Sequence, residues 1–274
     1  MLRKSLLALA SGAAFLATNQ VGFAADMPVK ARTGAYDWSG FYVGGTAGAA
    51  WTKADVGLDT VNNNNADLLY RTGDIPFLNA LGSPNMSGSK VTFGGKIGLN
   101  HQWGSYVGGL EADFSTFRFD KSARPSGNPF VVVPFYAGGA ASFNQNVSAS
   151  WLATFRGRVG YSFDRTLIYG TAGVALSRVS FSDTYAAHSP RGGLFDSETV
   201  STSKTKVGWV LGAGIDYALT NNWILSAEYL HIDLGSMRVS SLATTGGGFT
   251  RSATFNYSTK LTSDIVRAGI AYKF

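Results

Sequence analysis

The feature that most constrains this chain is a two-residue period of hydrophobicity that recurs along its length. In residues 206–219 every odd position is apolar, whereas the even positions are mostly small, with charges at Lys206 and Asp216. Only an extended strand places alternate residues on opposite faces. The same alternation is clear in residues 151–163 and 266–274. The period therefore predicts β-strands that each have one apolar face and one more polar face.

Less regular alternation in five further segments brings the predicted number of strands to eight; these segments are about 39–51, 89–102, 105–118, 166–180 and 223–236. Tight turns are predicted at Gly104, 163–165 and 220–222, and they alternate with long polar loops near 52–88, 119–145, 181–204 and 237–261. Strands of this length suit a tilted bilayer crossing, and this layout of connections is typical of outer-membrane barrels. The predicted fold class is all-β: an eight-stranded antiparallel up-and-down transmembrane β-barrel with short periplasmic turns and long extracellular loops.

Alternation alone does not say which face is outside, because a soluble eight-stranded barrel has the same period with the opposite polarity. Charged residues make up only 15% of the chain, and Gly is abundant at 34 residues. The polar face is mostly Gly, Ser, Thr and Ala, which suits a narrow lumen better than a water-exposed surface. We therefore expect the apolar face to contact lipid.

Composition also excludes several kinds of partner. The absence of Cys excludes disulfides and Cys-ligated metals. A net charge of +6 without a basic block indicates no nucleic-acid partner. The three histidines stand alone in the sequence, so we expect no metal site and no cofactor.

Two sets of side chains follow from the predicted faces. Aromatic residues near the short turns are expected to form a membrane-interface girdle; they are Trp103, Tyr106, Tyr161, Phe163, Tyr217, Trp223, Tyr272 and Phe274, with Trp51 and Trp151 as candidates for the other interface. Charged residues on the inward face are expected to pair inside the lumen, because enclosed charges are costly unless paired. They are Lys96, Glu111, Asp113, Arg156, Arg158, Asp216, Glu228, Arg267 and Lys273.

The first residues have the features of an export signal. Arg3 and Lys4 precede an apolar run that is too short to span a bilayer, and a small-residue cleavage site ends at Ala24. We predict a signal peptide over 1–24, a periplasmic segment over 25–38 and the barrel over 39–274.

Four segments resemble a known family: 38–45, 153–161, 225–230 and 266–274. They are similar to the small porin-type outer-membrane β-barrels of alphaproteobacteria, a group with surface immunogens and haemin-binding proteins. The resemblance implies a location in the outer membrane of a Gram-negative bacterium, after cleavage of the signal peptide. It also implies that Phe274 is read by the barrel-assembly machinery.

The function expected from these features is structural: a barrel that supports envelope integrity, contacts outer-membrane lipid and lipopolysaccharide, and has at most a narrow pore. Two alternatives stay open. One is a porin-type diffusion channel for small solutes. The other is a surface protein whose loops bind haem or another ligand, for which Tyr185 and His188 are the available iron ligands.

Two smaller hypotheses concern the predicted outer rim. Basic residues there could bind lipopolysaccharide phosphates; they are Lys121, Arg124, Arg238, Arg251 and Lys260, with Asp120 as the main opposing charge. A hydrolase would need a nucleophile and a base, for which His231, Asp233 and Ser236 are the nearest match. We favour a protein that is not an enzyme.

Overall fold

The computed structural model describes residues 36–63, 73–128, 139–188, 194–245 and 252–274. The chain divides into two units, Met1–Gly34 and Ala35–Phe274, and the described residues all belong to the second. The predicted signal peptide, residues 1–24, lies outside the described residues.

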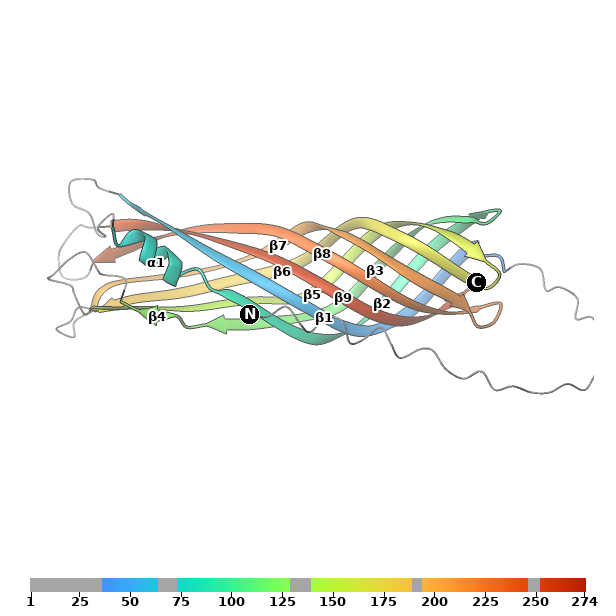
Figure 1. Cartoon of the computed structure of the whole chain (residues 1–274), viewed down its shortest axis with the longest axis horizontal. Helices are drawn as coiled ribbons and strands as arrows, with labels where there is room; N and C mark the ends of the chain where they lie inside the picture. The colour runs from blue at the N-terminus through green and yellow to red at the C-terminus, as the bar shows by residue number, and fades with distance from the viewer. Residues whose placement is uncertain (1–35, 64–72, 129–138, 189–193, 246–251) are drawn as a thin grey trace, which may run out of the picture. The chain divides into compact units, whose positions relative to one another are not determined.

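Eight long antiparallel strands form a closed ring (Figure 1). They are β1 Gly40–Asn62, β2 Asn85–Trp103, β3 Tyr106–Ala123, β5 Ala140–Phe163, β6 Thr166–His188, β7 Leu194–Ala218, β8 Trp223–Thr245 and β9 Ser252–Lys273. Each strand pairs with its neighbour in sequence, and pairing of β1 with β9 closes the ring. A two-residue strand, β4 Ser126–Gly127, pairs with β5, and a short helix, α1 Ile75–Leu81, precedes β2. No helix in the described residues has the length and apolar character needed to cross a bilayer.

The fold class predicted from the sequence is confirmed, including the three short turns. Gly104 and Asp164, in two of these turns, have φ of +61° and +53°, the left-handed conformation that tight connections use. All three turns lie at the same end of the ring, which we call the short-turn end.

The predicted strand boundaries at the other end are wrong. The strands run far into the stretches expected to be loops, so that β7 alone has 25 residues. The reason is visible on β9, where outward positions change from apolar Val266 and Ile270 to polar Asp264 and Lys260, while inward Leu261 stays buried. The period of two continues beyond this point, but the outward face is now polar and the inward face apolar. A strand predicted from one continuous apolar face therefore ends too early.

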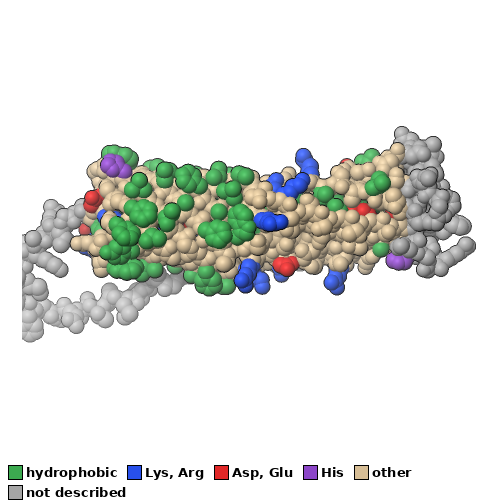
Figure 2. Space-filling view, turned by 180° about the vertical axis from the view of Figure 1, so that it is seen from behind, with side chains coloured by type: hydrophobic (Ala, Val, Ile, Leu, Met, Phe, Trp, Pro, Cys, Tyr) green, Lys and Arg blue, Asp and Glu red, His purple; other side chains and the backbone are tan. Residues whose placement is uncertain are grey.

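The wall of the barrel therefore has two parts of opposite polarity. Near the short turns, outward positions form an exposed apolar belt, with Phe114 at 60% and Val266 at 51% exposure. Beyond it, in what we call the outer half, outward positions are polar and inward ones form a hydrophobic core around Phe143, Tyr185 and Phe255. Figure 2 shows hydrophobic side chains gathered over one part of the surface and Lys and Arg at its edge. The soluble-barrel polarity, rejected for the whole chain, thus describes the outer half.

Helix α1 closes one side of this outer core. Leu78 is 1% exposed and belongs to the same cluster as Leu58 and Phe143. Gln145 donates from Nε2 to the carbonyl of Gly82, at 3.0 Å, just after the helix. The helix is therefore packed against the interior of the outer half.

Residues 36–38 were expected in the periplasmic segment, but they lie in the mouth of the barrel at the short-turn end. Trp38 is fully buried in a second cluster with Tyr42 and Tyr169. Its backbone N–H donates to Gln102 Oε1 at 2.7 Å, and the Tyr36 hydroxyl donates to the carbonyl of Asn221 at 3.2 Å. The barrel unit thus begins before residue 39, and its first residues fill its own mouth.

The packed outer core makes a first testable prediction. Phe143→Ala removes a ring that contacts Tyr185 at 4.8 Å and Phe255 at 6.4 Å between centroids. We expect a loss of about 3–5 kcal/mol in the free energy of opening of the outer half, the usual cost of such a cavity. Hydrogen-exchange mass spectrometry of the outer parts of β5 and β6 measures it. Phe155→Ala, at an outward position in the apolar belt, is the control and should leave these amides unchanged.

Candidate functional site

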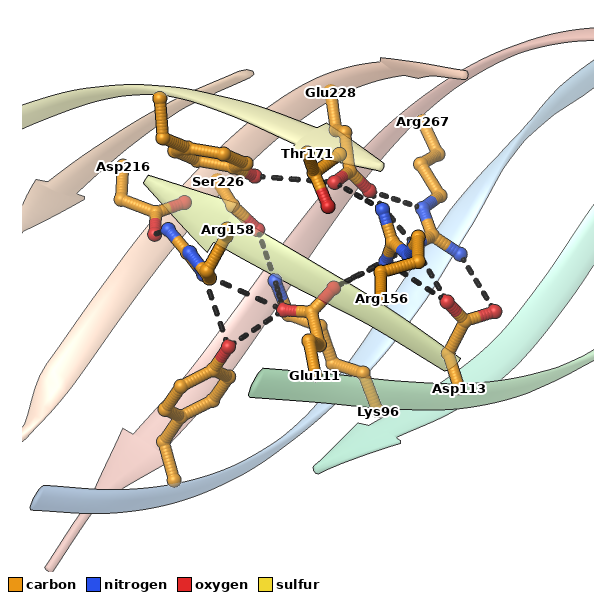
Figure 3. A network of polar contacts seen from close by, with 12 residues as sticks. Lys96, Glu111, Asp113, Arg156, Arg158, Thr171, Asp216, Ser226, Glu228 and Arg267 are labelled. Carbon is orange, nitrogen blue, oxygen red and sulfur yellow. Dashed lines mark hydrogen bonds and ion pairs between the residues drawn. The ribbon is translucent and has the colours of Figure 1, made fainter. Parts of the chain in front are cut away.

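Eight buried charged side chains meet inside the barrel at the level of the apolar belt (Figure 3). They are Lys96 from β2, Glu111 and Asp113 from β3, Arg156 and Arg158 from β5, Asp216 from β7, Glu228 from β8 and Arg267 from β9. The strand register places three pairs of opposite charges directly across from each other: Lys96 and Asp113, Glu111 and Arg156, and Glu228 and Arg267. We call this set the lumen network.

Arg156 is the centre of the lumen network and is fully buried. Its Nη1 lies 2.6 Å from Glu228 Oε1, and its Nη2 lies 2.9 Å from Asp113 Oδ2. Nη2 also contacts Glu111 Oε1. One guanidinium thus joins carboxylates from two different strands, as its planar fork of donors allows.

Arg267 closes the same ring of charges from the opposite wall. Its Nε donates to Glu228 Oε2 at 2.8 Å, and its Nη2 lies 3.0 Å from Asp113 Oδ2. Thr154 adds a hydroxyl that donates to the same Asp113 oxygen at 2.6 Å. Every carboxylate oxygen of Asp113 and Glu228 therefore has a cationic partner.

Arg158 extends the lumen network toward the short-turn end. It contacts Asp216 through Nη2, and its Nη1 donates to the hydroxyl of Tyr42 at 2.9 Å. The Tyr42 hydroxyl in turn donates to Glu111 Oε2 at 2.7 Å. The guanidinium carbon lies 3.7 Å from the ring centroid of Tyr169, a cation–π contact.

Charge balance explains how these ions can be buried. The network holds four carboxylates and four cations. The fourth cation is Lys96, whose Nζ lies 3.6 Å from Glu111 Oε2 and donates to Ser226 Oγ at 3.1 Å. Isolated ions would be very costly at this depth, whereas paired and hydrogen-bonded ones are tolerated. The network is neutral and occupies the lumen between the mouth filled by Trp38 and the outer hydrophobic core.

Lys273, the ninth charge expected in the lumen, lies elsewhere. Its Nζ donates to the backbone carbonyls of Asp37 and Ser39, and lies 4.5 Å from the ring centroid of Tyr36. Lys273 therefore holds residues 37–39 in the mouth of the barrel. It does not join the lumen network, because the end of β9 lies beside these residues.

Sequence reasoning did not assign to this site four neutral side chains that hydrogen-bond to the lumen network: Tyr42, Thr154, Tyr169 and Ser226. Tyr42 could have been found, since it shares the inward parity of Gly44 and Gly48 on its strand. Its ring needs Gly98 on β2, where an added Cβ would lie 2.3 Å from the Tyr42 hydroxyl oxygen. An aromatic opposite a glycine was the available signal.

The aromatic residues predicted for the girdle lie at the short-turn end. Seven of the eight are exposed large hydrophobics, with Phe274 at 69%, and Tyr272 is half-buried. Several touch one another across strands, as Tyr106 and Tyr161 do at 5.5 Å and Trp223 and Tyr272 at 5.3 Å between centroids. At the other edge of the apolar belt Trp151 stacks on Phe114, and Trp209, not predicted, is also exposed.

The pair suggested for haem is not brought together. Tyr185 is fully buried in the outer core, whereas His188, three residues along β6, is exposed on the opposite face. The two side chains therefore cannot present joint ligands at the surface.

The set suggested for hydrolysis is also separated. His231 Nδ1 lies 2.8 Å from Asp264 Oδ1 rather than bonding Asp233, and Asp233 instead forms an ion pair with Lys260 at 3.1 Å. Tyr229 donates to the same Asp264 oxygen at 2.7 Å. In the described part of the chain, no group of three or more His, Asp or Glu side chains could hold a metal ion.

The five basic residues suggested for lipopolysaccharide have different surroundings. Lys121 lies over Gly88, Arg124 donates to Asn144 at 3.2 Å, and Lys260 is paired with Asp233. Arg238 is exposed, and Arg251 lies outside the described residues. The five do not form one described cluster.

A second buried polar group lies in the outer half, beyond the apolar belt. Asp183 on β6 and Glu198 on β7 both face the hydroxyl of Tyr257, whose oxygen lies 2.6 and 3.2 Å from their carboxylates. Burial in the apolar core raises the pKa of Asp183 to about 7, and also raises the pKa of Glu198. One phenol hydrogen cannot serve two carboxylates, so this group retains protons well above the usual range for acids.

Comparison with known proteins matches the fold to a family. The model of the outer membrane protein beta-barrel domain matches residues 6–274. A 31 kDa outer-membrane immunogenic protein of Brucella melitensis biotype 1 is 30% identical over 97% of this chain and 98% of its own length. A 22 kDa outer membrane protein of Rhizobium leguminosarum bv. viciae is 29% identical over 78% of this chain and 71% of its own length.

Solved structures resemble the chain at low sequence identity. OprG from Pseudomonas aeruginosa is 12% identical with a TM-score of 0.40, and the match covers 88% of this chain and 98% of that one. The outer membrane protease OmpT from Escherichia coli is 12% identical with a TM-score of 0.42, covering 86% of this chain and 97% of that one.

The lumen network makes a second prediction. Arg156→Met keeps most of the volume but leaves Glu111, Asp113 and Glu228 short of a cation. We expect a loss of about 3–5 kcal/mol in the free energy of unfolding, because an uncompensated buried charge is left behind. Urea unfolding from lipid vesicles measures it. The exposed Arg118→Met is the control, and equal stability of the two variants would contradict the prediction.

The acid pair of the outer half makes a third prediction. Because the folded pKa of Asp183 is raised to about 7, its proton is lost from the unfolded chain first. Stability from this group is therefore full below about pH 4, the ordinary range for Asp, and falls as pH rises through about 7. Urea midpoints at pH 4.5 and 8 should differ less in Asp183→Asn than in the native chain. Asp59→Asn, at an exposed position, should keep the native difference.

Proposed function

This chain belongs to the outer membrane protein beta-barrel family and is an integral protein of the outer membrane of a Gram-negative bacterium, and from this premise we propose that it is a structural barrel with a closed lumen. Its short-turn end is then periplasmic and its outer half projects from the cell, as in other barrels of this kind. Its role is to span the envelope and to present a stable surface, and not to catalyse a reaction.

The neutral lumen network is the observation that carries this proposal. An interior of eight strands is narrow enough for side chains to fill. Here the ion-paired side chains around Arg156 lie between two further packed layers, the aromatic cluster of Trp38 and the hydrophobic core of Phe143. A solute would have to pass all three layers. The Brucella relative is named as immunogenic, which fits a surface that is open to the medium.

The aromatic residues support the same proposal at the periplasmic interface. The rings of Tyr106, Tyr161 and Trp223 are exposed beside the apolar belt, where amphipathic rings suit the level of the lipid head groups. Phe274 packs on Phe41, with 5.8 Å between ring centroids, and stays exposed. We assign to Phe274 the contact with the barrel-assembly machinery.

The alternative of a diffusion channel receives less support, because it needs a continuous water path through the lumen network. The alternative of a haem receptor would have to rely on His188 without Tyr185, since Tyr185 is buried.

Conductance distinguishes the structural barrel from a pore. Native protein in planar bilayers should give no steady channel above the background of the bare membrane. Arg156→Met should also stay closed, because the layers of Trp38 and Phe143 remain in place. Steady conductance of the native protein would contradict the closed lumen, and conductance only in the variant would make the network itself the gate of a narrow pore.

A further inference from the structure

The wall of the outer half is interrupted between β7 and β8. Their ladder pairs Ser197 with Thr244, stops, and resumes where Trp209 pairs with Asp233. Residues 198–208 of β7 and 234–243 of β8 are therefore not paired in register in this part of the wall. We call this stretch the β7–β8 seam.

The seam exposes both faces of β7. Ser203, Lys204 and Thr205 are consecutive in the strand and all three are exposed, although alternate residues of a covered strand would be buried. Gly235 and Ser236 on β8 are also both exposed, at a bulge where β8 shifts its register against β9. Side chains at inward positions of β7 thus reach solvent through the seam.

Three cations lie on the β7 side of the seam, with Arg178 at an outward position of β6. Lys204 and Lys206 occupy inward positions, and Lys206 Nζ donates across the seam to the carbonyl of Ser236 at 2.7 Å. Arg178 on β6 pairs in register with Thr205, and its Nε donates to Ser203 Oγ at 2.9 Å. Within the described residues none of these three cations forms a salt bridge, in contrast to Lys260, which Asp233 neutralises.

The height of the three cations in the membrane indicates their partner. The next outward residues of β7 toward the periplasm are Val207 and Trp209, exposed by 64% and 48%, which form the upper edge of the apolar belt. The cations therefore lie where hydrocarbon gives way to lipid head groups.

We propose that the β7–β8 seam is a binding site for the phosphate groups of lipopolysaccharide in the outer leaflet. Arg178 can engage a phosphate with two parallel donors, and Lys204 and Lys206 add point charges. The proposal rests on the outer-membrane location and not on the closed lumen, so either can fail without the other.

A matched pair of triple variants tests the site. The seam variant is Arg178→Gln, Lys204→Gln and Lys206→Gln, and the control is Arg124→Gln, Lys121→Gln and Lys260→Gln, which removes the same charges from parts of the outer half that lie farther from the apolar belt. Folding of each is verified by heat-modifiable gel migration. Binding of purified bisphosphorylated lipid A to the folded protein in neutral detergent is measured by native mass spectrometry, with dephosphorylated lipid A and inorganic phosphate as further probes.

The seam variant should bind bisphosphorylated lipid A roughly a hundredfold more weakly at low salt, at about fivefold per cation, and the control should lose little. Dephosphorylated lipid should bind all proteins weakly, and millimolar inorganic phosphate should not compete. Equal losses in both variants would reduce the effect to general surface charge and overturn the site. Competition by inorganic phosphate would make it a free-anion site and overturn the lipid assignment. If the triple variant does not fold, Lys204→Gln alone should show the fivefold loss, and its absence would also overturn the proposal.

Discussion

The closed hydrogen-bond ladder is the constraint on which this structure depends. Inside hydrocarbon no water is available to pair with backbone N–H and C=O groups, so a wall of strands must close on itself. Here β1 and β9, the first and last strands, meet over a continuous register from Tyr42 and Lys273 to Asn62 and Ala253. Closure with a period of two leaves every strand with one face toward lipid and one toward a narrow interior. The lumen network and the apolar belt are the two consequences of that division.

Where the wall leaves the lipid, the strands remain paired but the polarity of their two faces is reversed. Water replaces hydrocarbon outside, outward positions become polar, and inward positions form an apolar core around Phe143. The rule on ladder pairing also relaxes, because water can now satisfy an open backbone group. The β7–β8 seam begins directly above Trp209. The β2–β3 ladder stops lower, at Gly94 and Ser115, and there the hydroxyl of Thr116 accepts from the N–H of Phe93 while Thr92 donates to the Thr116 carbonyl.

The sequence could predict the part of the molecule in which one polarity holds. Parity alone selects Glu111, Arg156 and Arg267 as inward, because each alternates with lipid-facing apolar residues on its own strand. Parity could not give the strand ends, since the reversal of polarity resembles the end of a strand. Nor could it place Lys273 or Trp38, whose positions depend on how the entering segment folds back into the mouth. The hydrophobic period of a single strand does not predict contacts between segments that are far apart in the sequence.

The lumen network also helps to explain how this barrel fixes its register. A shift of one residue moves every side chain of a strand to the other face. In a lipid-facing barrel with a wholly apolar lumen, such a shift would exchange one apolar face for another at little cost. Here it would turn Arg156 toward hydrocarbon and separate the directly opposed pairs of Glu111 with Arg156 and Glu228 with Arg267. Breaking a buried ion pair costs about 3–5 kcal/mol. Each directly opposed pair therefore destabilises any shift in the register of the two strands that carry it. The charges that fill the lumen therefore specify which residues of neighbouring strands face each other.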